Sequence, residues 1–377
     1  MASSGALKSV ELYIRKLLIK PKEHFSGIMI NDIIDAPILP LNPRILIIRP
    51  DRIGDMLITL PSLRVIRNTY PNAIIDIVVG KANLSILTQF QRYVNSVYVY
   101  DKSLKSILSL LIELPKQSYD LVIDPLDNPS TTSGYLVKLA KAKHSIGIYK
   151  QNAHIYSHCV IAKDRNTVHI VERTAQILLS LKINPSTCNL DLEYTHSDKD
   201  IVDAKKEMYS LTDGASIIAI NIAGSVQART IMPELAIPMI QKIQDHIKDK
   251  NIKIIVFGEQ KHATILQEIK QACTIIIAPF SKSFHQYAAK LKSASMIISP
   301  DTSAIHLAGA WKTPTLGLFL NDNSHTALWT PYKTPHEIAY TEDNSVNSLT
   351  ADQIYTAFCN IYPKVEWQTL DITFNHS

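Results

Sequence analysis

Two segments far apart in this chain share one pattern: a strand-length apolar run, a polar loop and the start of a helix. Residues 45–48 lead into the loop at 49–55, and residues 294–298 lead into the loop at 299–306. Open α/β sheets bind ligands at the carboxyl ends of their strands, beside helix N-termini. Two such segments in one chain predict two sheets that face each other across a cleft.

Length and composition fit that prediction. The chain has 377 residues, of which 46% are hydrophobic, enough for two buried cores. No apolar run reaches the roughly 20 residues of a membrane span, and the N-terminus lacks the features of a secretory signal. The four cysteines are scattered and form no C-x-x-C pair, which argues against a disulfide scaffold and a structural zinc site. A reducing cytoplasm is the expected compartment.

The net charge of +5 suits anionic small molecules or an anionic membrane surface. Aromatic residues are not interleaved with a basic stripe, so no nucleic-acid partner is expected. Residues 9–20 predict an amphipathic helix with basic neighbours. That helix either packs on its own domain or lies at an anionic lipid surface.

From residue 44 onward, strand patterns alternate with helix patterns, which predicts parallel, doubly wound α/β sheets. Strands are expected at 44–48, 73–79, 96–100, 121–124 and 144–147, and then at 217–222, 253–257, 274–277, 296–299 and 315–319. Helices are expected at 62–69, 105–114, 131–140, 168–181, 198–209, 234–249, 262–272, 283–293, 303–310 and 349–361. The predicted organisation is an extension (1–40), a first domain (41–210), a second domain (211–345) and a terminal helix with its tail (346–377). The boundary between the two domains is expected either near the polar connection at 184–196 or, as in these ranges, shortly after the helix at 198–209.

The first loop gathers Arg49, Asp51, Arg52 and Asp55 around Gly54, which is expected at a tight turn. An isolated Asp at this position is usually a helix cap. Four charged residues are more than a cap needs, and a carboxylate at the mouth of a cleft can accept a proton from an incoming hydroxyl. Asp55 is the preferred candidate for that base, with Asp51 as its competitor.

The second loop places Thr302 and Ser303 at a helix N-terminus, where hydroxyls and free backbone N–H groups can bind phosphate. Asp301 and Thr302 are equally well explained as ordinary N-cap residues. His306 follows Thr302 by four residues and therefore lies on the same helix face. A single helical histidine is more often structural than functional.

Two weaker signals follow other strands of the second half. Ser225 and Arg229 lie in a loop that can contact an anion, or they belong to a solvated loop. Glu259 ends the next strand, where a carboxylate can bind a ribose diol or remain an exposed side chain. The dispersed histidines give no support for a metal site, so no metal is expected.

With these loops in hand, the chain resembles glycosyltransferase family 9, the ADP-heptose:lipopolysaccharide heptosyltransferases. The resemblance lies in ILIIRPDRIGDMLITLPSLRVIRNTYPNAIIDIVV (45–79), ASMIISPDTSAIHLAGAWKTPTLGLF (294–319) and ALWTPY (327–332). Ser303 stands where many members have glycine. The resemblance implies a GT-B fold, with two Rossmann-like domains facing a central cleft. The first domain would receive the acceptor, and the second would hold the nucleotide-sugar.

The resemblance also implies a mechanism: inverting sugar transfer without a metal or another cofactor. Asp55 would be the general base, beside the acceptor-side residues Arg49, Asp51, Arg52 and Gly54. The residues implied to hold the donor are Ser225, Arg229, Glu259, Asp301, Thr302, Ser303 and His306.

The expected function is transfer of a heptose-type sugar from an ADP-sugar, with ADP-heptose as the expected donor, to a lipid-linked acceptor in the lipopolysaccharide core. Such an enzyme would be cytoplasmic and in peripheral contact with the inner membrane. Two alternatives stay open: the same fold acting on another nucleotide-sugar for a different surface glycan, and a non-catalytic nucleotide-sugar-binding protein.

Overall fold

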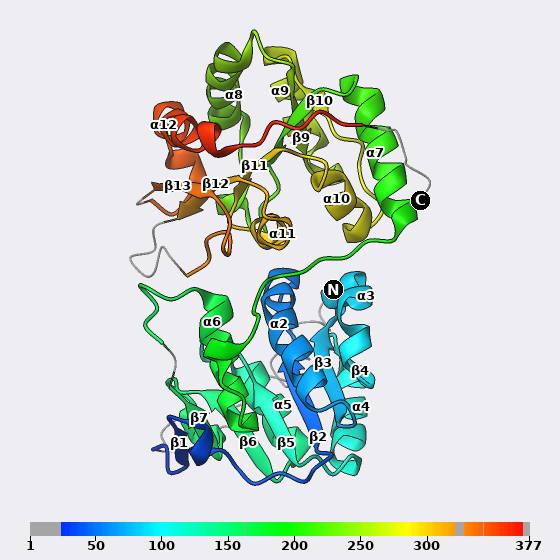
Figure 1. The fold of residues 1–377 in the computed structure, drawn as a ribbon, viewed down its shortest axis with the longest axis vertical. Helices are drawn as coiled ribbons and strands as arrows, with labels where there is room; N and C mark the ends of the chain where they lie inside the picture. Colours follow the sequence, from blue (N-terminus) through cyan, green and yellow to red (C-terminus); the bar gives the residue numbers. More distant parts are fainter. Residues whose placement is uncertain (1–23, 162, 321–327, 342, 372–377) are drawn as a thin grey trace, which may run out of the picture. The chain divides into compact units, whose positions relative to one another are not determined.

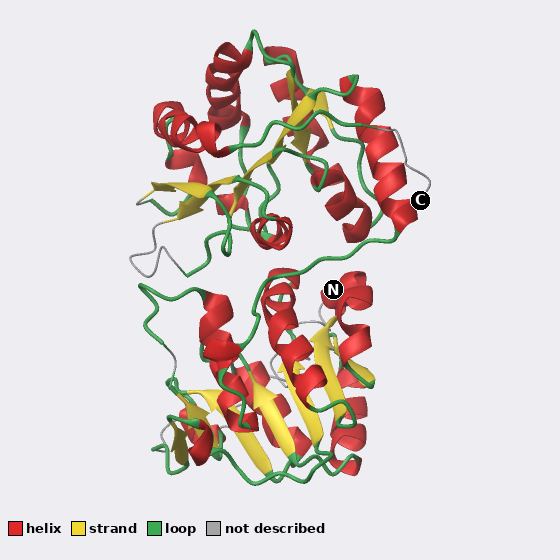
Figure 2. Cartoon of the chain, in the orientation of Figure 1, coloured by secondary structure: helices red, strands yellow, loops and turns green. Residues whose placement is uncertain are grey.

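The computed structural model describes residues 24–161, 163–320, 328–341 and 343–371. The helix predicted at residues 9–20 lies outside these ranges. The chain divides into two compact units, Met1–Leu190 and Asp191–Ser377, and each is built from strands and helices in alternation (Figures 1 and 2).

The first unit contains a parallel sheet of seven strands. The strands are β1 (Ile28–Ile30), β2 (Arg44–Arg49), β3 (Ile74–Gly80), β4 (Ser96–Tyr100), β5 (Leu121–Asp124), β6 (His144–Ile148) and β7 (His158–Val160). Their order across the sheet is β1-β7-β6-β5-β2-β3-β4. The strands expected from the sequence are all present, and the prediction of a doubly wound parallel sheet is confirmed for this unit.

Helices cover both faces of this sheet, which is why its strands read as nearly continuous apolar runs. They are α2 (Ile53–Thr69), α3 (Leu87–Phe90), α4 (Leu104–Lys116), α5 (Thr131–Ala140) and α6 (Ile170–Thr174). Leu46 and Ile48 of β2 pack with α4 and α5 in one core. Because side chains alternate along a strand, Ile45 and Ile47 face the other side of the sheet. There α2 packs against α6 and α3.

Three local predictions in the first unit differ from the structure. The helix expected at 62–69 begins at Ile53 and includes Pro61, so Gly54 lies in the first helical turn and not in a tight turn. The helix expected at 168–181 is α6 followed by a 3-10 helix at Ala175–Leu181. The 1–40 extension contributes β1, which pairs with β7. These two strands have three residues each, too few to show a period of two.

The second unit contains a parallel sheet of six strands. They are β8 (Ser216–Asn221), β9 (Ile252–Phe257), β10 (Ile276–Ile277), β11 (Met296–Pro300), β12 (Thr315–Leu320) and β13 (His336–Thr341), in the order β10-β9-β8-β11-β12-β13. The sequence did not predict β13. The helices are α7 (Asp198–Thr212), α8 (Pro233–Ile247), α9 (Ala263–Ala272), α10 (Phe284–Leu291), α11 (Ser303–Trp311) and α12 (Ala351–Ile361). One core joins β8 with α8, α9 and α12.

The division between the units falls at residues 190 and 191, within the polar connection at 184–196 that was one of the two expected places for the boundary and not after residue 210. Helix α7 belongs to the second unit because it packs on α10, where the ammonium of Lys290 lies 3.0 Å from the carboxylate of Glu207. The C-terminal segment also belongs there, since α12 packs on α8 and the Leu370 N–H donates to the Gly214 carbonyl. No helix within the described ranges is long and apolar enough to cross a bilayer.

The strand order places one topological switch point in each sheet. In the first unit the chain leaves β2 toward β3 on one side, while β5 lies on the other. In the second unit β8 leads to β9 on one side and has β11 on the other. Loops that diverge at a switch point leave room for a ligand at the carboxyl edge of the sheet. Both loops singled out from the sequence follow strands that border these points.

Candidate functional site

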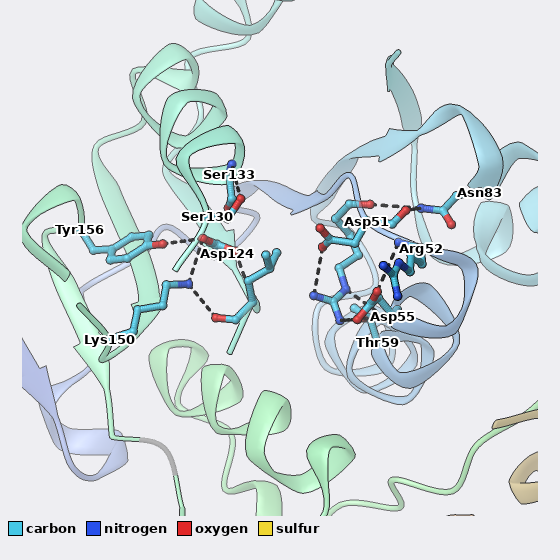
Figure 3. A network of polar contacts seen from close by, with 12 residues as sticks. Asp51, Arg52, Asp55, Thr59, Asn83, Asp124, Ser130, Ser133, Lys150 and Tyr156 are labelled. Atoms are coloured by element: carbon cyan, nitrogen blue, oxygen red, sulfur yellow. Dashed lines mark hydrogen bonds and ion pairs between the residues drawn. The ribbon is translucent and has the colours of Figure 1, made fainter. Parts of the chain in front are cut away.

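In the first unit the polar side chains gather at the carboxyl ends of β2 and β5 (Figure 3). Arg49, the last residue of β2, is buried and holds the loop that follows. Its Nε donates to the Asp55 carbonyl at 3.0 Å. Its two terminal nitrogens lie 3.4 Å from one carboxylate oxygen each of Asp51 and Asp55. One guanidinium therefore holds both candidate bases in place.

Asp55 is the third residue of α2. One of its carboxylate oxygens accepts from the Arg52 backbone N–H at 3.3 Å, and the other pairs with Arg49. The side chain thus caps the helix, as the structural interpretation predicted. It is also partly exposed, which leaves it accessible to a substrate. Arg52 takes part in this group through its backbone, while its side chain is exposed.

Asp51 is more buried than its position in a loop would predict. Burial raises its pKa to about 6, and the positive charge of Arg49 opposes that effect. The negative charges of Asp55 and Asp124 raise the pKa further, because each disfavours a second charge nearby. Asp51 therefore exchanges a proton near neutral pH.

Replacing Asp51 by Asn is expected to stabilise the protein at pH 7.5. The folded-state pKa lies above the unfolded value, so the fold disfavours the ionised form, and stability falls as pH rises from about 4 to about 6. Because the side chain is 27% exposed, we expect a gain of about 1–2 kcal/mol for Asn, or roughly 3–6 °C in Tm. Thermal melts of both proteins should converge as the pH is lowered to 4.5. A constant difference across this range would contradict the expectation.

Asn83 fixes the same loop from the end of β3 and was not singled out by the sequence. It is fully buried, and its amide donates to the carbonyls of Arg49 at 3.3 Å and Asp51 at 3.1 Å. Gly80 lets the chain pass close by, since a Cβ there would lie 2.4 Å from the Pro50 carbonyl oxygen. Asn83 lies in a 3-10 helix (Lys81–Ile86) and carries no distinguishing spacing, so only the folded chain reveals this role.

A second polar group lies at the end of β5, and the sequence missed it as well. The buried Asp124 carboxylate accepts a hydrogen bond from the Tyr156 hydroxyl and pairs with the Lys150 ammonium at 3.3 Å. Lys150 also donates to the Leu126 carbonyl at 2.6 Å. The Leu126 N–H in turn donates to Asp124 at 3.0 Å. This group ties the loops after β5 and β6 together beside Asp51 (Figure 3).

The loop after β5 holds another buried ion pair. The Arg173 guanidinium of α6 lies 2.6 Å from Asp127, and Arg165 approaches the same carboxylate at 3.5 Å. Two cations therefore converge on one carboxylate, and the charge of Arg173 also reaches the carboxylate of Asp164.

In the second unit the polar side chains meet at the ends of β8 and β11. The Asn221 amide donates to the Ser299 hydroxyl at 3.0 Å and to the Thr302 hydroxyl at 3.3 Å. The Thr302 hydroxyl also accepts from the Ala304 N–H at 3.3 Å, so it caps α11 as the sequence predicted. Asn221 and Ser299 support this cap and were not among the expected site residues.

Arg229 and Asp301, which the sequence placed in separate loops, form an ion pair of 2.9 Å at the start of α11. The loop that carries Arg229 is tightly folded, since a Cβ on Gly224 would lie 2.3 Å from the Arg229 carbonyl carbon. Ser225 in the same loop is exposed. Arg229, Asp301 and Thr302 therefore belong to one group, in which a guanidinium lies beside a helix N-terminus.

Ser303 begins α11, and His306 lies one turn further along the helix. His306 is buried, and burial lowers its pKa to about 4. Its Nδ1 has no hydrogen-bond partner among the described residues. The imidazole is therefore neutral at pH 7 and adds no positive charge.

Glu259, another expected donor residue, stands apart from this group. It follows β9, its side chain is exposed, and its carboxylate pairs with Lys261 at 3.0 Å. Across the described residues, no three His, Cys, Asp or Glu side chains are grouped as metal ligands.

Comparison with known proteins shows the family to which this chain belongs. The model described as glycosyltransferase family 9 (heptosyltransferase) matches residues 107–354. Lipopolysaccharide heptosyltransferase 3 of Escherichia coli strain K12 is 26% identical over 301 residues, which cover 74% of this chain and 82% of the relative. The range matched by the family model includes the group of Arg229, Asp301 and Thr302, whereas the loop with Asp55 precedes that range.

Solved structures show the same fold. Glycosyltransferase family 9 from Veillonella parvula DSM 2008 matches with a TM-score of 0.71 and 18% identity, covering 87% of this chain and 99% of that chain. E. coli ADP-heptose lps heptosyltransferase II matches with a TM-score of 0.61 and 16% identity, covering 85% of this chain and 99% of that chain. E. coli heptosyltransferase WaaC with ADP matches with a TM-score of 0.61 and 19% identity, covering 85% of this chain and 98% of that chain. The predicted GT-B class is confirmed. The match over residues 107–354 shows that this chain belongs to glycosyltransferase family 9 and is therefore a glycosyltransferase.

Proposed function

We propose that this chain transfers a heptose-type sugar from an ADP-sugar to a lipid-linked acceptor of the lipopolysaccharide core, with inversion at the anomeric carbon and without a metal ion or another cofactor. The observation that carries the proposal is the Arg49–Asp51–Asp55 group at the switch point of the first sheet. It supplies carboxylates where an acceptor hydroxyl would bind. Membership of a heptosyltransferase family supports the choice of sugar.

In the proposed reaction, Asp55 accepts the proton of an acceptor hydroxyl. The resulting oxygen nucleophile attacks the anomeric carbon, and the bond from that carbon to the diphosphate breaks on the opposite face. The sugar becomes bonded to the acceptor oxygen with inverted configuration, and ADP departs with the electrons of the broken bond. Arg49 keeps Asp55 oriented through its bonds to the carboxylate and the carbonyl of that residue.

The second unit offers groups that suit the departing diphosphate. The dipole at the start of α11 favours negative charge, and the Arg229 guanidinium lies beside this helix end. The neutral His306 would contribute a hydrogen bond to the sugar or phosphate. Glu259, at the end of the neighbouring β9, is proposed to bind the ribose through its exposed carboxylate. Solved family structures whose names include ADP support that nucleotide.

The test is calorimetric titration of the full chain with ADP, UDP, GDP and CDP in the presence of EDTA. We expect selective binding of ADP, and we expect Arg229→Ala to weaken it about tenfold or more, because a charge-assisted hydrogen bond to phosphate is lost. Lys364→Ala, which removes a surface lysine paired with Glu337, serves as the matched control and should bind ADP normally.

Each component of the proposal has its own contrary outcome. Preference for another nucleotide would replace the ADP-sugar donor while leaving the family unchanged. Dependence of transfer on a divalent metal would contradict the metal-free mechanism. A product with retained configuration at the anomeric carbon, read from its NMR coupling constant, would contradict inversion.

A further inference from the structure

Helix α4 of the first unit is apolar on two sides. Its inward side chains Ile107, Leu110 and Leu114 lie in the core against β2, β4 and α5. A surface helix normally turns polar side chains to solvent on its other side. On α4 a second set of large apolar residues is exposed instead, by 52%, 49%, 40% and 55%: Leu104, Leu108, Leu111 and Ile112.

These four residues form a continuous stripe. Their spacing of four, three and one residues puts them on one side of the helix, since positions three or four apart are neighbours on a helix surface. With 13 residues, α4 is about 20 Å long, and the first and last members of the stripe are separated by two helical turns. Large apolar side chains gathered in one exposed patch mark an interaction surface, whereas single ones do not.

The surroundings of the stripe are basic. Lys105 and Lys116 lie seven residues before and four residues after Ile112, on the same flank of the helix. Lys102 precedes the helix, and the charge of Lys81 reaches Asp101.

The two acidic groups in this region already have partners. The Asp101 carboxylate accepts from the Ser103 N–H at 2.9 Å, and Glu113 lies 3.2 Å from Lys116. The four lysines nevertheless outnumber these two acidic residues, so the stripe is apolar with a net positive margin. That combination fits an anionic lipid surface better than a neutral protein surface.

We propose that α4 docks the first unit on an anionic phospholipid bilayer, with Leu104, Leu108, Leu111 and Ile112 entering the interface and the lysines meeting the headgroups. The helix follows β4, so its first turn lies at the carboxyl edge of the parallel sheet (Figure 1). Asp51 and Asp55 follow β2 and therefore lie at the same edge. A lipid-linked acceptor could keep its acyl chains in the bilayer while its glycan reaches that edge. The lipid-linked acceptor rests on the proposed function, whereas the apolar face of α4 does not depend on it.

The experiment is cosedimentation of the full-length protein with phosphatidylcholine vesicles, with and without phosphatidylglycerol. We expect binding to the anionic vesicles, weakened about tenfold or more by Leu108→Gln/Ile112→Gln. Lys105→Gln should weaken it about fivefold. The matched control is Ile28→Gln/Ile161→Gln, which replaces two equally exposed residues at the opposite end of the same sheet. It should bind like the wild type. Unchanged Tm would show that the variants remain folded.

Several results would overturn the proposal. These are failure of the wild type to bind anionic vesicles, equal binding by Leu108→Gln/Ile112→Gln, and equal loss in the control. Light scattering that shows a dimer dissolved by the α4 substitutions, together with no vesicle binding, would assign the face to a second copy of the chain. Because the assay contains no donor and no acceptor, failure of the proposed sugar transfer would leave its result unchanged. Failure of vesicle binding would likewise leave transfer to a soluble acceptor untouched.

Discussion

Replacing Asp55 by Asn is expected to lower kcat by about 10³-fold, because an amide cannot accept the proton of the acceptor hydroxyl. The affinity for ADP should stay unchanged, since the residues proposed to hold the donor belong to the other unit. The fold should also persist: the Asn side-chain oxygen can still accept from the Arg52 N–H, and Arg49 keeps its ion pair with Asp51. Steady-state kinetics together with ADP titration measure both effects.

Asp51→Asn is the comparator that separates the two candidate bases. It removes a carboxylate from the same guanidinium while leaving Asp55 in place. If Asp55 is the base, Asp51→Asn should retain most of its turnover, with changes confined to the pH profile. Loss of turnover in Asp51→Asn with activity preserved in Asp55→Asn would reverse the assignment.

Replacing Lys150 by Met is expected to destabilise the protein by about 3–5 kcal/mol, because the Asp124 carboxylate would remain buried without its counter-ion. For a unit of this size the loss corresponds to a fall of roughly 10 °C in Tm. Both side chains of the pair are almost fully buried, at 4% and 1% exposure, so solvent would do little to compensate. Thermal melting at pH 7.5 measures the change.

Two further variants give this prediction its controls. Lys143→Met removes a lysine that pairs with Asp120 at 2.8 Å at the other end of the same two strands, but Lys143 is 70% exposed. Its removal should cost less than about 1 kcal/mol. Adding Asp124→Asn to Lys150→Met should recover part of the loss, because the buried charge is gone. The amide oxygen can still accept from the Leu126 N–H, and the amide NH2 can donate to the Tyr156 hydroxyl oxygen. Equal losses for the two lysine variants would contradict the expectation.

The sequence predicted the parts of the site that lie within one loop. Arg49, Asp51 and Asp55 stand within seven residues of one another directly after a strand, so their proximity follows from the chain itself. The same holds for the cap of α11 by Thr302. In each case the sequence shows an apolar run, a polar loop and a helix start, in that order. The strand order of the two sheets confirms that both loops border a switch point.

The parts that the sequence could not predict depend on sheet order. Lys150 follows Asp124 by 26 residues, with no spacing rule to connect them, and only the packing of β5 between β2 and β6 brings them beside Asp51. Asn221 and Ser299 meet for the same reason across 78 residues. The wrong prediction for Gly54 has another cause: glycine is permitted in turns but is not confined to them, and Arg52 rather than Gly54 precedes the helix.

The Arg49–Asp51–Asp55 group has a consequence for charge balance during turnover. With both acids ionised, the trio carries one excess negative charge in a largely enclosed place. Uptake of a single proton makes it electrically neutral, so the half-dry surroundings favour the very transfer that a base must perform. Returning that proton to water is then a separate event, which must be complete before the next acceptor arrives.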